Sequence, residues 1–68
     1  NMNDLQAPPL CRTTLDFVLT KLFYRREQAD VMAERAHRNN DPNGYARWHN
    51  ASLTLTNAMN EIAPLKEP

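Results

Sequence analysis

The sequence predicts an all-α fold, an antiparallel hairpin of two long helices that dimerises into a four-helix bundle. In both expected helices, residues 13–38 and 42–63, the apolar residues recur every three or four positions, which is the spacing of one helix face. The first of these segments contains neither Gly nor Pro, the two residues that most disfavour a helix. The segment between them is short, and a short connection makes consecutive helices antiparallel neighbours.

The first helix is expected to begin at Thr13, because Thr13 followed by Asp16 matches a variant of the capping box. Its main apolar stripe, which we predict to be its half of the hairpin core, consists of Leu15, Val18, Leu22, Ala29, Met32 and Ala36. Arg25 and Arg26 interrupt this stripe. Long arginine side chains can cover apolar surface with their stems while the charged ends reach water.

A second apolar stripe runs along the other side of the same helix. Phe17, Tyr24 and Val31 are each seven residues apart, so at 3.6 residues per turn they line up on the side opposite the main stripe. A helix that is apolar on two sides must cover two surfaces, and one partner helix covers only one. We therefore predict that these three residues form the interface with a second copy or with another protein.

The turn is expected at residues 39–44, which are Asn, Asp, Pro and Gly. Asn tolerates the left-handed conformation that ends many helices. Asp41 is the expected N-cap of the second helix, with Pro42 at its first position. Pro64 is expected to end that helix.

The second helix contributes the other half of the predicted core. Its stripe consists of Tyr45, Trp48, Leu55, Met59 and Ile62, and Ser52 fills the one weak position. Trp48 is expected to be the central anchor, facing the small residues late in the first helix. The domain organisation is therefore an extended tail at residues 1–12, the hairpin at residues 13–63, and a second tail at residues 64–68.

Length and composition narrow the class of protein. A chain of 68 residues has room for one domain, and domains of this size usually need a staple, a metal or a partner chain. Cys11 is the only cysteine, so it forms no disulfide within the chain, which favours a reducing compartment. No apolar run is long enough to span a membrane, and the start of the sequence does not resemble a signal peptide. We expect a cytoplasmic protein.

The sequence offers no catalytic set. Gly44 is the only glycine, which excludes a Gly-rich phosphate loop. His37 and His49 are the only histidines, and two histidines on separate elements fall short of the three or four ligands of a zinc site. We therefore expect no enzyme, no metal and no cofactor.

Two functions remain as hypotheses. The first is a small non-enzymatic protein–protein interaction or regulatory module that acts through its helical packing faces, with a homodimer as the expected form and a larger protein as the other partner. The alternative is an RNA- or DNA-binding hairpin dimer. Its candidate anion or nucleic-acid contacts are the basic residues of the first helix, Lys21, Arg25, Arg26, Arg35 and Arg38. Acidic residues interleave with them, and a strong nucleic-acid footprint has fewer acids.

Overall fold

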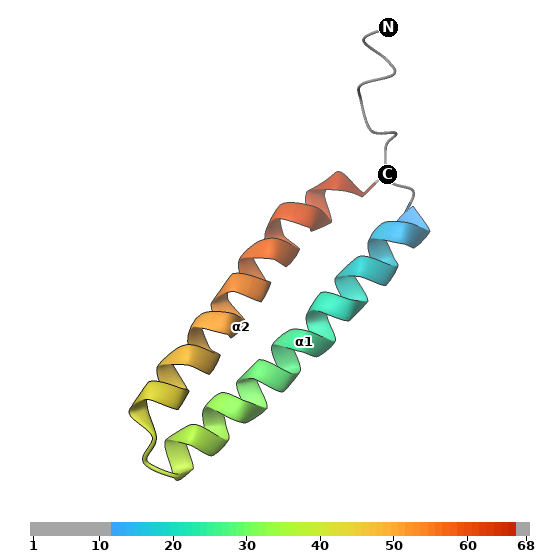
Figure 1. Cartoon of the computed structure of the whole chain (residues 1–68). Coiled ribbons are helices and arrows are strands. Elements are labelled where there is room, and N and C mark those ends of the chain that lie inside the picture. Colours follow the sequence, from blue (N-terminus) through green and yellow to red (C-terminus); the bar gives the residue numbers. More distant parts are fainter. Residues whose placement is uncertain (1–11, 67–68) are drawn as a thin grey trace, which may run out of the picture.

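Two long helices lie side by side and antiparallel (Figure 1). The computed structural model describes residues 12–66. Helix α1 spans Arg12–Arg38, helix α2 spans Pro42–Ile62, and a short 3-10 helix, η2, spans Ala63–Leu65. The prediction of an all-α helical hairpin is confirmed. Residues 1–11 of the predicted tail at 1–12, Cys11 included, lie outside the described residues, and its last residue, Arg12, belongs to α1.

The open end of the hairpin differs from the expectation. Helix α1 already includes Arg12, so Thr13 has helical conformation and is not the cap. Asp16, expected to reach back to the first turn, instead forms an ion pair with Lys66. Residues 64–66 are therefore not a free tail, because η2 and Lys66 fold back beside the start of α1. The physical reason is that the hairpin brings two opposite charges, far apart in sequence, to the same end.

The turn follows the local chemistry that was predicted for it. Asn40 has a φ of 54°, the left-handed conformation that Asn tolerates better than most residues. Around it the Asn40 amide donates to the His37 carbonyl at 3.1 Å, and the Asp41 amide donates to the Ala36 carbonyl at 2.9 Å. This pair of bonds is a Schellman motif, which satisfies carbonyl groups that the end of α1 would otherwise leave unpaired.

Helix α2 starts at the predicted cap. The side chain of Asp41 accepts a hydrogen bond from the Gly44 amide at 2.9 Å, and Pro42 occupies the first helical position, so both predictions are confirmed. A Cβ at Gly44 would lie 2.2 Å from Oδ2 of Asp41. Glycine at this position therefore leaves the space that the capping carboxylate occupies.

The centre of the helix pair is made largely of small residues. The buried side chains of the described residues are Leu15, Ala29, Ala33, Ala36 and Ser52. Apart from Tyr45, the other residues that were expected in the core are half-buried. These are Val18, Leu22, Met32, Trp48, Leu55, Met59 and Ile62. Two helices form one layer, so large side chains at their junction keep one flank in water.

Tyr45 was expected in the core and is 40% exposed. Its ring lies at the edge of the helix pair, stacked on His49 with the ring centres 5.5 Å apart. The helical repeat alone does not separate the centre of an apolar stripe from its edge, and the phenol group of an edge tyrosine stays hydrated. Within residues 12–66 no helix is long and apolar enough to cross a membrane.

Candidate protein-interaction surface

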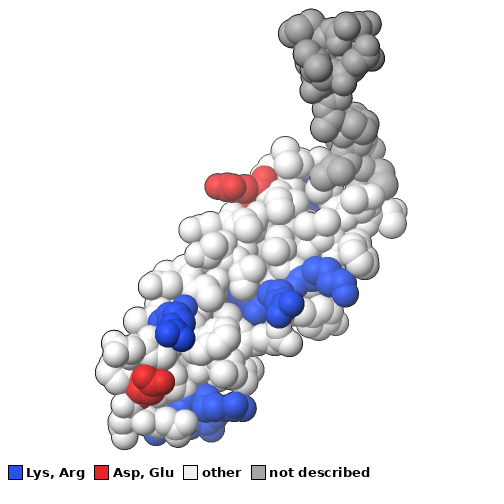
Figure 2. All heavy atoms as spheres, in the orientation of Figure 1, with Lys and Arg blue, Asp and Glu red and all other residues white. Residues whose placement is uncertain are grey.

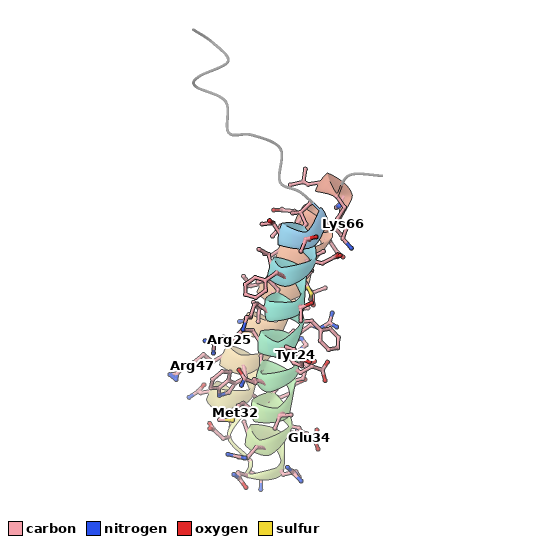
Figure 3. The ribbon with its side chains drawn as sticks, turned by 90° about the vertical axis from the view of Figure 1, so that its right-hand side faces the viewer. Tyr24, Arg25, Met32, Glu34, Arg47 and Lys66 are labelled. Carbon is pink, nitrogen blue, oxygen red and sulfur yellow. The ribbon has the colours of Figure 1, made fainter. Side chains whose placement is uncertain are left out.

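The second stripe of α1 is exposed to solvent. Phe17 is 63% exposed, Tyr24 62% and Val31 56%. All three project from the part of α1 that faces away from α2, and Figure 3, which looks onto α1 with α2 behind it, labels Tyr24 there. Large apolar side chains lined up on one side of a helix are typical of a surface that another chain covers.

A broad hollow joins part of this stripe to the junction of the two helices. Its volume is about 820 Å³. Helix α1 contributes Tyr24, Arg25, Glu27, Gln28, Ala29, Val31 and Met32, and helix α2 contributes Trp48, Ala51 and Leu55. Phe17 lies outside it. The hollow therefore connects exposed residues of the second stripe with half-buried residues of the predicted core in one largely apolar surface.

The lining of the hollow combines small and large side chains. Ala29 on α1 and Ala51 on α2 have side chains of one carbon and fill little space, whereas Met32, Trp48 and Leu55 are large. The result is a concave apolar surface, the shape that receives a helix or a large side chain of a partner.

Charge is distributed unevenly around the hollow. In Figure 3, Arg25, Arg47 and Met32 project on one side of the hairpin, whereas Glu34 and Lys66 project on the other. Figure 2 shows the first of these sides. Lys and Arg lie along the middle and lower part of that face, and Asp and Glu are seen only towards its upper left and lower left.

The structure does not bring the five candidate nucleic-acid contacts together. Arg26 is half-buried with its guanidinium 5.3 Å from the centre of the Phe23 ring. The Nε atom of Arg38 lies 4.0 Å from Oε1 of Glu34, and Figure 3 shows Glu34 on the side of the hairpin opposite Arg25. Lys21 lies over the Phe17 ring at 5.3 Å. Arg35 is exposed, and Arg25 borders the hollow.

A second cluster lies at the turn. The Tyr45 ring is stacked on the His49 ring. The centre of the His37 ring lies 5.9 Å from the centre of the Tyr45 ring, and the two ring planes are inclined at 55°. A smaller hollow of about 370 Å³ is lined there by His37, Asn40, Asp41, Pro42 and Tyr45. Among residues 12–66, no three His, Cys, Asp or Glu side chains lie close enough together to bind a metal ion.

One interaction between the helices was missed in the sequence. The Ser52 hydroxyl donates a hydrogen bond of 2.5 Å to Oδ1 of Asp30. Asp30 is exposed as a whole residue, but it follows the buried Ala29 and its carboxylate reaches across to α2. The signal in the sequence was Ser52 itself, a small polar residue in the middle of an apolar stripe, which needs a partner when it is buried.

Comparison with known proteins finds no relative of the chain. No protein-family model matches the chain, no curated protein matches it, and no solved structure matches it. What can be said of its function therefore comes from the surfaces described above.

Proposed function

We propose that the chain is a small, non-enzymatic protein–protein interaction or regulatory module that acts through its helical packing faces. The observation that carries this proposal is the hollow lined by Tyr24, Val31, Met32, Trp48 and Leu55. These are large apolar side chains, and all of them are exposed or half-buried. Covering them with apolar surface is favourable at about 25 cal/mol per Å².

The partner we propose is a second copy of the chain, which gives a homodimer built as a four-helix bundle, acting in the cytoplasm. A single two-helix layer has few fully buried side chains, and Leu15 is the only large one among the described residues. Two such layers enclose a core between them, which is how four-helix bundles are built from hairpins. A chain this short gains much of its stability from such an assembly.

The mass of the chain in solution tests this proposal. The wild-type protein should show twice the chain mass of 7.9 kDa by light scattering. Tyr24→Glu places a charge in the hollow and should shift the mass towards 7.9 kDa, while circular dichroism keeps the helix signal, because Tyr24 is exposed within the hairpin. Leu53→Glu is the matched control, since Leu53 is also exposed but does not line the hollow.

Two results would contradict the proposal. One is a wild-type mass of 7.9 kDa at every concentration, which would assign the hollow to a different protein. The other is an equal loss of mass in Tyr24→Glu and Leu53→Glu, which would show that the hollow has no special role.

The second candidate function is nucleic-acid binding by a hairpin dimer. The observation that favours it is the gathering of Lys and Arg on the face in Figure 2. An electrophoretic mobility-shift experiment at two salt concentrations separates the two functions. Binding through phosphate contacts weakens steeply with salt, whereas apolar association does not.

A further inference from the structure

We propose that the hollow has a second occupant, an amphipathic helix of a different protein with Asp or Glu beside its apolar face, and that this helix displaces the second copy of the chain. This inference rests on the proposed function, because it names a regulator of the same surface. Three observations support it: the lining of the hollow, the arginines on the face that contains it, and the position of the acidic residue at its edge.

The lining of the hollow is suited to a helix. It extends from Tyr24 to Met32 on α1 and from Trp48 to Leu55 on α2, which is about two turns of each helix. Most of the lining side chains are apolar, and they come from two helices that lie side by side (Figure 1). A third helix laid along such a junction inserts apolar side chains from successive turns. The phosphate backbone of a nucleic acid has no apolar side chains to insert, so the lining favours a protein.

Two arginines lie on the face that contains the hollow, one on each helix. Arg25 lines the hollow, and Figure 3 shows Arg47 projecting on the same side of the hairpin. In Figure 2, which shows this face, Lys and Arg lie along the middle and lower part, and Asp and Glu are seen only towards the upper left and lower left. Acidic side chains of a partner would therefore meet cations on both helices.

The register of the helices gives the spacing of the two arginines. The hydrogen bond from Ser52 to Asp30 sets residues whose numbers add up to 82 at the same level, so Arg47 lies level with Arg35. Arg25 is ten residues from that level, which is about 15 Å along the helix axis. A partner helix of about three turns therefore spans both arginines.

The acidic residue at the edge of the hollow projects away from α2. Glu27 lines the hollow, but it is two residues from the buried Ala29, so it projects about 200° around α1 from the contact with α2. Arg25 is four residues from Ala29, about one turn, and therefore projects from close to that contact. A helix lying over the junction meets Arg25 there, whereas Glu27 lies at the outer edge.

A second copy of the chain does not supply the opposite charges. When two copies face each other across the hollow, the basic face of one meets the basic face of the other. Among the described residues, Arg25 makes one hydrogen bond, to Oε1 of Gln28 at 3.5 Å, and Arg47 makes no ion pair, so both remain available to a partner. An acidic amphipathic helix covers the apolar lining and pairs with these arginines, and for that reason it displaces the second copy.

Two synthetic peptides test the inference. Both are amphipathic helices of about 20 residues with the same leucine face, and one has Glu on both flanks of that face where the other has Gln. In fluorescence anisotropy the Glu peptide should bind the wild-type chain about tenfold more tightly than the Gln peptide, and added salt should remove the difference. Light scattering should show a complex of one chain and one peptide, because the peptide takes the place of the second copy.

Substitutions of single arginines locate the contact. The ratio of the two peptide affinities is compared between variants, because homodimerisation lowers both affinities equally. Arg25→Glu and Arg47→Glu should each lower this ratio about fivefold. Arg38→Glu is the matched control and should leave the ratio unchanged, because Arg38 is exposed, does not line the hollow and lies near Glu34. Circular dichroism checks that each variant remains helical, as expected for exposed positions.

Several results would overturn the inference. A ratio of one in the wild type would do so, and so would a ratio that Arg25→Glu and Arg38→Glu lower equally. A peptide that binds without separating the two copies would occupy another surface. A homodimer that binds neither peptide would overturn the inference and leave the proposed function standing. A chain that is monomeric without peptide and binds the Glu peptide with the expected ratio would support the inference and remove the homodimer.

Discussion

The two halves of the hairpin bury their side chains differently. In the half next to the turn, α1 contributes three alanines to the contact, Ala29, Ala33 and Ala36, and all three are buried. In the half at the open end, α1 contributes Leu15, Val18 and Leu22. Only Leu15 is buried there, and the other two keep part of their surface in water.

The difference shows what one partner helix can cover. An alanine side chain ends within the contact between two helices, so a single neighbour buries it. A leucine or a tryptophan extends past the contact and needs a second layer on its flank. The half next to the turn therefore fixes the approach and register of the helices. The larger side chains of the hairpin supply apolar surface that a second chain can cover.

The largest loss of stability is expected from a substitution at the open end of the hairpin. Leu15→Ala should lower the free energy of unfolding by about 3 kcal/mol, because it removes the one large side chain that the hairpin buries completely. For so small a domain this is a large part of the total stability. Urea unfolding followed by circular dichroism measures the change. A loss below about 1 kcal/mol would mean that the open end does not contribute a packed core.

A smaller effect is expected from enlarging a residue near the turn. Ala33→Leu should destabilise the hairpin by about 2 kcal/mol, because the added carbons force the helices apart where they are in contact. The control is Ala46→Leu, since Ala46 is exposed and has room for a larger side chain. The same unfolding experiment compares the two. Equal stabilities would contradict close packing in this half.

The smallest effect is expected at the buried polar contact. Ser52→Ala removes the hydrogen bond to Asp30 and should cost about 1 kcal/mol. Thr54→Ala is the control, because the Thr54 hydroxyl bonds to the Asn50 carbonyl of its own helix and crosses no interface. A Ser52→Ala variant as stable as Thr54→Ala would show that the contact between the helices adds no stability.

The local features of the fold were predictable from the sequence. The cap at Asp41, the proline at the start of α2 and the left-handed residue in the turn each depend on a few neighbouring residues. The two-helix arrangement followed from the apolar repeat and the short connection. These signals are independent of how the two helices are aligned.

The features that depend on alignment were not predictable. The Asp30–Ser52 hydrogen bond and the Asp16–Lys66 ion pair require the register of α1 against α2, which an apolar stripe leaves open. The hollow requires residues of both helices, among them Ala29 and Ala51, to line the same side of the helix junction. The exposure of Tyr45 depends on its position at the edge of the stripe. The three residues of the second stripe were predicted as an interface, but only Tyr24 and Val31 line the hollow.

Trp48 gives the most direct test of the central claim, that a second copy covers the hollow. It is the only tryptophan, it is half-buried within the hairpin, and it lines the hollow. Quenching of its fluorescence by acrylamide should weaken, and its emission should shift to shorter wavelength, as the protein concentration rises and the mass doubles. In the Tyr24→Glu variant, acrylamide should quench Trp48 at every protein concentration as strongly as it does in the dilute wild-type protein. Quenching of the wild type that stays constant while the mass doubles would contradict the account, because the dimer would then form on another face.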